Sequence, residues 1–204
     1  MELRNNVISR DLNTMKRNCT AIILIGMPCV GKSTLGALLA DNLSLEFIDT
    51  DRSIEKFLDR NLQDVIDEDG YMALRTAEEK VLLAETVTSK VIATGGSAVY
   101  SEKGMNYLKS KGFVIFLDLP QKNLEDRITN FSTRGIARRP DQSFACLFDE
   151  RRSIHQSCSP TLALSFCEEY QCSHLWQGPR RLEVQRIYQI HSRLMSCFAD
   201  YLEQ

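Results

Sequence analysis

The residues best suited to chemistry lie in the run 26–34, Gly-Met-Pro-Cys-Val-Gly-Lys-Ser-Thr, directly after the apolar run 21–25. This spacing is typical of a loop that cradles phosphate groups between a strand and a helix. Its glycines allow close approach of the backbone, and its N–H groups point inward at an anion. Lys32 would reach the β- and γ-phosphates, and the Ser33 hydroxyl would ligate Mg²⁺. Because an apolar run precedes the loop and an amphipathic stretch follows it, we favour a nucleoside triphosphate site over a chance match.

Two carboxylates follow the next apolar run, in the sequence Asp49-Thr50-Asp51. Phosphoryl transfer needs charge neutralisation and a positioned nucleophile. One carboxylate could support Mg²⁺, while the other accepts the proton of an acceptor hydroxyl. The alternative is a solvated acidic turn. We favour the functional interpretation because ligands of parallel sheets bind at the carboxyl ends of strands.

Glycines and arginines further along the chain could hold the acceptor. Gly95-Gly96 ends the apolar run 91–94 and offers backbone N–H groups to a small ligand, or is only a tight turn. Arg75 stands among acids and, taken alone, predicts an exposed ion pair. Arginines between 130 and 152 could close over phosphates or form a solvated basic surface; they are Arg134, Arg138, Arg139, Arg151 and Arg152.

The elements that must position these residues alternate along the chain. Strands are predicted at about 20–25, 45–49, 91–94 and 113–118. Helices are predicted from the cradle to 43, at 52–59, at 61–88 with a break at Gly70, at 103–110 and at 182–202. This alternation predicts an α/β fold of three layers, α/β/α, around a parallel sheet, which we expect to have five strands. The cradle, Asp49–Asp51 and Gly95-Gly96 should then converge on one crevice.

Composition narrows the class of protein. The 204 residues suit one domain, and 43% of them are hydrophobic, enough for a core. A net charge of −2 argues against nucleic-acid binding through bulk charge, and no apolar run approaches a membrane span. Residues 1–18 lack the apolar stretch of a secretory signal, so we expect a cytoplasmic protein. We expect an extension at 1–18 and a single domain at 19–204, with a lid at about 130–145.

Seven cysteines at irregular spacings predict reduced thiols, most of them buried as small apolar residues. A zinc site is the alternative, but no pair spaced C-x₂-C supports it. Its candidate ligands are Cys158, Cys167, Cys172 and His174.

Taken together, these motifs resemble the shikimate kinase family, small P-loop proteins similar to nucleoside monophosphate kinases, over about residues 21–165. The matching segments stand in one order: 26–36, Asp49–Asp51 with Ile54-Glu55, 65–70 with Leu74-Arg75 and 78–81, 91–96, and Glu150-Arg151. The resemblance implies a P-loop kinase that transfers phosphate from ATP, with Mg²⁺, to the 3-hydroxyl of shikimate in aromatic amino acid biosynthesis. We expect a monomer that binds only these small molecules.

The resemblance also implies roles for single residues. It implies that ATP is bound by Cys29, Val30, Gly31, Lys32, Ser33, Thr34, Arg134 and Arg138. It implies that Ser33 and Asp49 support Mg²⁺. Shikimate would be held by Asp51, Arg75, Gly95, Gly96 and Arg151, since guanidinium groups pair with carboxylates in a bidentate manner. The implied catalytic residues are Lys32, Asp51 and Arg134.

Three departures from the family pattern leave alternatives open. Ser97 stands where the family has a third glycine, and the lid has 133–140 (Thr-Arg-Gly-Ile-Ala-Arg-Arg-Pro) in place of Arg-Pro-Leu-Leu. Arg134, Arg138 and Arg139 therefore all remain candidates for the lid arginine. His155, in place of an aromatic residue, is interpreted as a space-filling side chain rather than a polar contact. The alternative functions are a kinase of another hydroxy acid, such as gluconate, and a catalytically silent nucleotide-binding module.

Overall fold

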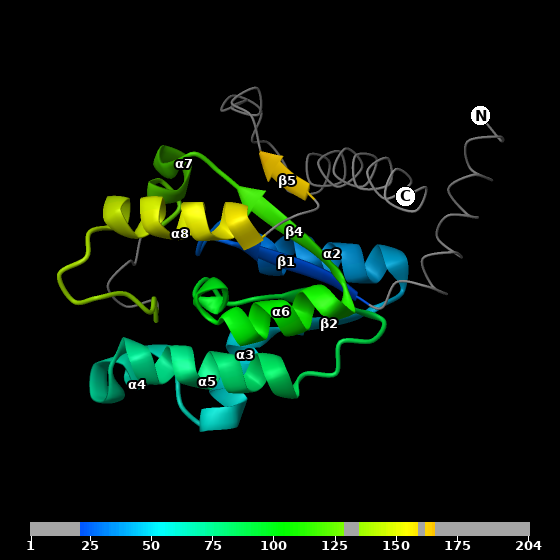
Figure 1. The fold of residues 1–204 in the computed structure, drawn as a ribbon, viewed down its shortest axis with the longest axis horizontal. Helices are drawn as coiled ribbons and strands as arrows, with labels where there is room; N and C mark the ends of the chain where they lie inside the picture. The colour runs from blue at the N-terminus through cyan, green and yellow to red at the C-terminus, as the bar shows by residue number, and fades with distance from the viewer. Residues whose placement is uncertain (1–20, 129–134, 159–161, 166–204) are drawn as a thin grey trace, which may run out of the picture.

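The computed structural model of the chain describes residues 21–128, 135–158 and 162–165. Within these residues, helices cover both faces of a central sheet (Figure 1). The predicted extension at 1–18, the predicted helix at 182–202 and Arg134 lie outside the described residues. So do three of the four candidate zinc ligands, whereas Cys158 is described and carries a free thiol.

The sheet has five strands in the order β2-β3-β1-β4-β5, and every neighbouring pair is parallel. The strands are β1 Ala21–Gly26, β2 Glu46–Asp49, β3 Lys90–Ala93, β4 Phe113–Asp118 and β5 Leu162–Ser165. Central strand β1 sets Ile23 opposite Ile92 of β3 and opposite Val114 of β4. The chain crosses from one side of β1 to the other, and such a switch point opens a crevice at the carboxyl end of the strand. The predicted α/β class is confirmed.

The helices follow the sequence pattern with shifted ends. They are α2 Lys32–Leu43, α3 Thr50–Leu58, α4 Leu62–Asp69, α5 Tyr71–Ala84, α6 Glu102–Lys111, α7 Gln121–Glu125 and α8 Phe144–Cys158, with a 3₁₀ turn η1 at Ala98–Tyr100. Helix α3 begins two residues before its predicted start because the Asp49 carboxylate accepts the N–H of Asp51 and caps it. The predicted helix 61–88 is two helices, separated at Gly70, where φ is 83°. None of the helices in the described residues is long and apolar enough to cross a membrane.

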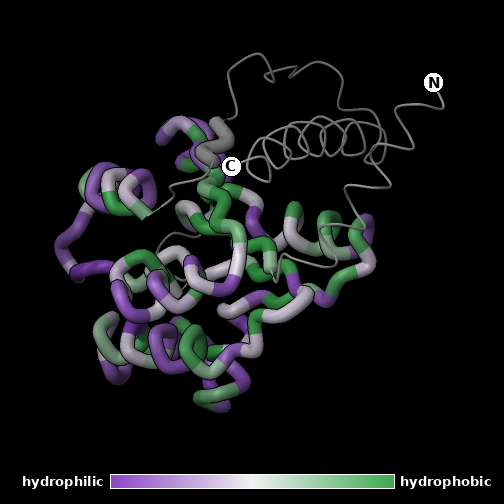
Figure 2. Tube along the Cα trace, turned by 45° about the vertical axis from the view of Figure 1, so that its right-hand side comes forward, coloured by the Kyte–Doolittle hydropathy of each residue, from purple (hydrophilic) through white to green (hydrophobic). Residues whose placement is uncertain are grey.

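Side chains of β1 alternate between the two faces of the sheet. Ile22 and Leu24 pack in the cluster that contains the apolar residues of α2, whereas Ile23 and Ile25 pack with those of α5 and α6. Figure 2 shows hydrophobic stretches along the interior, with hydrophilic stretches on the outer segments. Helix α8 contributes to both clusters, so its middle, which carries Arg151, is held in place from both sides.

A third apolar cluster joins α3, α4 and α5 through Ile54, Val65, Leu74, Ala77 and Val81. Ala137, from the described part of the predicted lid, belongs to the same cluster and is 3% exposed. Just before it, the Gly135 N–H donates to Gln63 Oε1 of α4 at 2.8 Å. The segment 135–137 is therefore packed onto these helices, next to the carboxyl edge of the sheet.

Candidate functional site

A cavity of about 340 Å³ opens among the segments that follow the strands. It is lined by the cradle, α3, α5, the turn after β3, residues 135–137 and α8. As the sequence predicts, the cradle, the acidic segment and the glycine turn meet at one place. The polar lining includes Lys32, Ser33, Asp51, Glu78, Ser97, Arg127 and Arg151.

The backbone of the cradle takes conformations that few side chains tolerate. Gly26 has φ 148° and Gly31 has φ 103°, while Cys29 adopts φ 64°. A Cβ on Gly26 would stand 2.6 Å from the carbonyl oxygen of Leu117 in β4, a forbidden approach. The glycines are thus required by the path of this loop, which the sequence predicts to bind phosphate.

Lys32 is enclosed by this loop. Its Nζ donates to the carbonyl oxygens of Gly26 at 2.8 Å and Met27 at 2.9 Å. Burial lowers the pKa of Lys32 to about 8, and the Asp51 carboxylate opposes this shift. The ammonium group is therefore held at the floor of the cavity, where its charge is weakly screened.

The two predicted Mg²⁺ ligands differ in position. Ser33 lines the cavity, whereas Asp49 does not, and Asp49 Oδ1 accepts the N–H of Asp51 at 3.1 Å. Among the residues described, no three His, Cys, Asp or Glu side chains gather as a metal site. Mg²⁺ prefers oxygen donors and keeps several waters beside substrate phosphates. The hydroxyl of Ser33 and the carboxylate of Asp49 fit this donor chemistry.

The two arginines predicted to bind a carboxylate reach the same oxygen atom. Arg151, 1% exposed, donates from Nη2 to the Ala137 carbonyl at 2.6 Å, and Arg75 Nη2 lies 3.5 Å from that oxygen. Arg151 lines the cavity, whereas Arg75 stands behind it, with its guanidinium 3.5 Å from the centre of the Tyr100 ring. A Cβ on Gly96 would stand 3.0 Å from Arg151 Nη1, so the bare turn leaves room for this guanidinium. Gly95 lies behind Gly96 and is not part of the lining.

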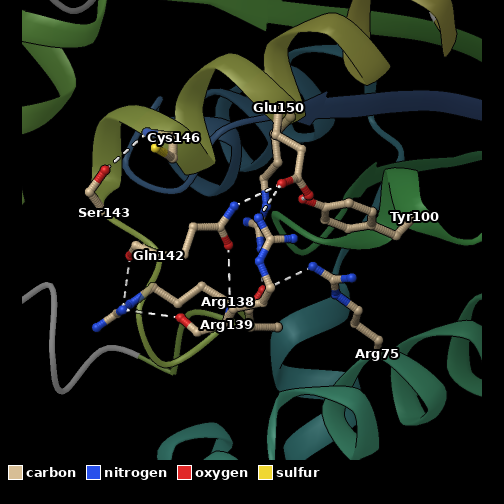
Figure 3. A network of polar contacts seen from close by, with 10 residues as sticks. Arg75, Tyr100, Arg138, Arg139, Gln142, Ser143, Cys146 and Glu150 are labelled. Carbon is tan, nitrogen blue, oxygen red and sulfur yellow. Dashed lines mark hydrogen bonds and ion pairs between the residues drawn. The ribbon is translucent and has the colours of Figure 1, made fainter.

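Glu150 links the described part of the predicted lid to Tyr100 through hydrogen bonds (Figure 3). Its Oε1 accepts the hydroxyl of Tyr100 at 2.5 Å. Its Oε2 accepts from Gln142 at 2.8 Å and from Arg139 at 3.0 Å. These bonds, with those of Ala137, hold the segment 137–142 over the two arginines.

The candidate lid arginines are placed differently from one another. Arg138 donates from Nη1 to carbonyls of its own loop, including Gln142 at 3.0 Å, and does not line the cavity. Arg139 pairs with Glu150. Arg127, which the sequence interpretation missed, does line the cavity and lies 3.5 Å from the Cys29 carbonyl. Its position after the carboxyl end of β4 was the available signal.

Glu78 is the second residue that the sequence interpretation missed. It is 2% exposed and lines the cavity from α5. Burial raises the pKa of Glu78 to about 7, partly offset by a hydrogen bond from Ser97. The signal was an acid on the apolar face of a helix, one turn after Leu74 and three residues before Val81.

Two neighbouring arginines of α8 have different surroundings. Arg151 enters the cavity, while Arg152 forms a bidentate pair with Asp118 at the end of β4, with distances of 2.8 and 3.2 Å. His155, one turn beyond Arg151, is fully buried and stacks on Phe116 with ring centres 5.0 Å apart. Burial holds its pKa well below the usual range, and the charges of Lys32 and Arg151 act in the same direction. A neutral, stacked imidazole agrees with the space-filling interpretation.

Comparison with known proteins gives one consistent result. The family model described as shikimate kinase matches residues 28–169. A shikimate kinase of Aquifex aeolicus is 35% identical over 136 residues, 66% of this chain and 80% of the relative. A shikimate kinase of Rippkaea orientalis is 34% identical over 147 residues, which are 71% of this chain and 78% of the relative. The solved structure of the shikimate kinase from Acinetobacter baumannii in complex with shikimate superimposes with a TM-score of 0.70 at 25% identity, covering 89% of this chain and 97% of that one.

Proposed function

This chain belongs to the shikimate kinase family, and from that premise we propose that it transfers the γ-phosphoryl group of ATP to the 3-hydroxyl of shikimate. The products are 3-phosphoshikimate and ADP. The bond between the γ-phosphorus and its bridging oxygen breaks, a new bond to the acceptor oxygen forms, and the hydroxyl proton leaves to a base.

The observation that carries this proposal is the convergence of Arg75 and Arg151 on one oxygen. Both guanidinium groups donate to the Ala137 carbonyl, beside a cavity that also holds Asp51. Guanidinium groups suit carboxylates, which offer two charged oxygens where the carbonyl offers one neutral oxygen. The carboxylate of the acceptor replaces the Ala137 carbonyl, and residues 136–138 move aside as it binds.

The nucleotide side of the reaction rests on the cradle. Its N–H groups and Lys32 bind the β- and γ-phosphates, and Lys32 stabilises the charge that spreads over the transferring group. Ser33 and Asp49 would hold Mg²⁺, which neutralises phosphate charge when bound. Arg127 completes the nucleotide half from the loop after α7, whereas Arg134 and Arg138 stay predictions for this role.

On the acceptor side, Asp51 orients the hydroxyl and receives its proton. It lies on the first turn of α3, whose start is fixed by the Asp49 cap. Gly96 leaves the acceptor room against the turn after β3. Because the cavity brings the cradle and Asp51 together, it favours transfer to a bound hydroxyl over transfer to water.

Three further features are proposals from the sequence. They are the requirement for Mg²⁺, a cytoplasmic location and a monomeric state. The domain division, with an extension at 1–18 and a single domain at 19–204, also stays a prediction because its ends lie outside the described residues.

A coupled ADP-release assay with purified protein tests the function. ATP and Mg²⁺ are supplied with shikimate, with gluconate or with no acceptor. We expect ADP release that depends on shikimate. Release only with gluconate would establish the other hydroxy acid kinase, and ATP binding without release on any acceptor would establish the silent module.

A further inference from the structure

Ser97 and Glu78 form a buried pair in the wall of the cavity. Ser97, just after the glycine turn, is 7% exposed, and Glu78 of α5 is 2% exposed. The Ser97 hydroxyl donates to Glu78 Oε2, while Glu78 Oε1 has no hydrogen-bond partner in the part of the chain that the structure describes. One hydroxyl therefore fixes the orientation of this carboxyl group.

The other oxygen of Glu78 lies against Gly95. A Cβ at Gly95 would stand 2.2 Å from Glu78 Oε1 and 2.6 Å from Asp51 Oδ1, so both carboxyl groups meet at the bare side of this glycine. Gly95 is itself held by its N–H, which donates to Thr50 Oγ1 at 2.8 Å. Glu78, Gly95 and Asp51 thus pack as one unit, and a turn of the Glu78 side chain would change the surroundings of Asp51.

Charges around Glu78 pull its carboxyl group in opposite directions. Asp51 of α3 repels it, while Lys32 of the cradle and Arg151 of α8 attract it. Without the Ser97 hydroxyl, the buried carboxyl would lose its hydrogen bond and be free to turn toward Arg151. In that position the Glu78 carboxyl group would pair with Arg151, which the acceptor needs, and would leave a gap beside Asp51.

We propose that Ser97 is a positioning residue for the acceptor, because its hydrogen bond holds Glu78 against Gly95 and thereby preserves the place beside Asp51 where the acceptor hydroxyl binds. This inference rests on the proposed function and concerns the acceptor half of the same site. It assigns a role to a side chain at a position where the family pattern has glycine. The cradle does not depend on this contact.

The test compares Ser97→Ala, which removes the hydroxyl, with Ser97→Thr, which keeps it. A hydrogen bond to a charged group is worth enough that the KM for shikimate should rise about tenfold in Ser97→Ala, while kcat and the KM for ATP change less than about twofold. Ser97→Thr should restore most of the affinity. Ser101→Ala is the matched control. Ser101 is a nearby buried serine whose hydroxyl donates to Glu79, the neighbour of Glu78 in the sequence, at 2.6 Å, and it does not line the cavity.

The pH profile supplies a readout that a general loss of packing would not move. The hydrogen bond from Ser97 lowers the pKa of Glu78, so its removal raises that pKa further. The limb of kcat/KM for shikimate near pH 7 should move to higher pH in Ser97→Ala and disappear in Glu78→Gln. In the Glu78→Gln background, adding Ser97→Ala should change the KM for shikimate less than about twofold, because the coupled group is gone.

The outcomes separate the two proposals. If the wild-type protein releases no ADP with shikimate, the proposed function fails and this inference fails with it. If the wild-type protein is active and Ser97→Ala matches it in KM and pH profile, the inference alone is overturned. An equal rise in KM in Ser101→Ala would overturn it too, since the effect would then be one of general packing.

Discussion

The proposed nucleotide half of the cavity is formed mainly by one continuous stretch of chain, with Arg127 added from the loop after α7, whereas the proposed acceptor half is assembled from five segments. The nucleotide half depends on backbone conformation. Cys29 and Gly31 have positive φ angles, and Lys32 donates hydrogen bonds to carbonyl oxygens of the same loop. The second half brings side chains from α3, α5, the turn after β3, residues 135–137 and α8 to one wall.

This difference predicts where each half is sensitive to change. In the nucleotide half, function depends on a local loop conformation. In the acceptor half, it depends on charged side chains that are buried beside one another, where each partner alters the next. The acceptor half also contains Ser97 and the lid segment, where departures from the family pattern are expected from the sequence.

The largest effect on activity is expected from a substitution of Asp51, which should impair the acceptor half and leave the nucleotide half intact. Asp51→Asn removes the proton acceptor, so kcat should fall by at least about 100-fold while ATP binding is retained. Rates of coupled ADP release and binding of a fluorescent ATP analogue measure the two quantities. The control Asp59→Asn makes the same chemical change at the end of α3, outside the cavity. A normal rate of ADP release in Asp51→Asn would show that Asp51 is not the residue that receives the proton of the acceptor.

Adjacent arginines of α8 provide a matched pair. Arg151→Lys should raise the KM for shikimate by about 100-fold, because an ammonium group cannot copy the bidentate contact of a buried guanidinium. Arg152→Lys should leave that KM unchanged and cost about 1 kcal/mol of stability at most, since its partner Asp118 lies outside the lining. Steady-state kinetics and urea unfolding measure both. Equal effects on KM would contradict the division of roles.

Glu78 should give the acceptor half a pH-dependent stability. Its pKa is about 7 in the fold, above the ordinary 4.5, so the folded chain binds the proton more tightly than the unfolded chain. The stabilisation is complete below pH 4.5 and is lost as pH rises through 7. Relative to Glu78→Gln, the wild-type protein should lose on the order of 3 kcal/mol between pH 4.5 and pH 8, measured by urea unfolding. A constant difference between the two proteins would contradict the burial of this carboxyl group.

The smallest effect is expected for arginines at the nucleotide half. Arg127→Ala should raise the KM for ATP about fivefold, because an exposed cation contributes modestly to phosphate binding. Arg138→Ala should change it less than about twofold if its guanidinium stays on the carbonyls of its own loop. Titrations of ATP at saturating shikimate decide between them. The reverse order would restore Arg138 to the role implied by the resemblance.

The sequence predicted the features that depend on local pattern. The parallel sheet followed from apolar runs that alternate with helices, and the cradle followed from nine contiguous residues. The predicted break of the helix 61–88 at Gly70 is confirmed, whereas its predicted end was wrong, because the second helix ends at Ala84.

What the sequence did not predict are contacts between distant segments. Arg75 alone suggested an exposed ion pair, yet its guanidinium lies on Tyr100 and reaches Ala137, 62 residues away. Glu78 was passed over among neighbouring acids, because only tertiary packing sets which of them is buried. Arg138 was grouped with the other lid arginines, although its hydrogen bonds go to its own loop.

Identification of the reaction product is the sharpest test of the proposed function. The protein is incubated with ATP, Mg²⁺ and shikimate, and the mixture is followed by phosphorus NMR. The proposed function predicts a new phosphomonoester resonance coupled to the proton at carbon 3 of shikimate, formed in equal amount to ADP. ADP accompanied only by inorganic phosphate, or no consumption of ATP, would contradict it.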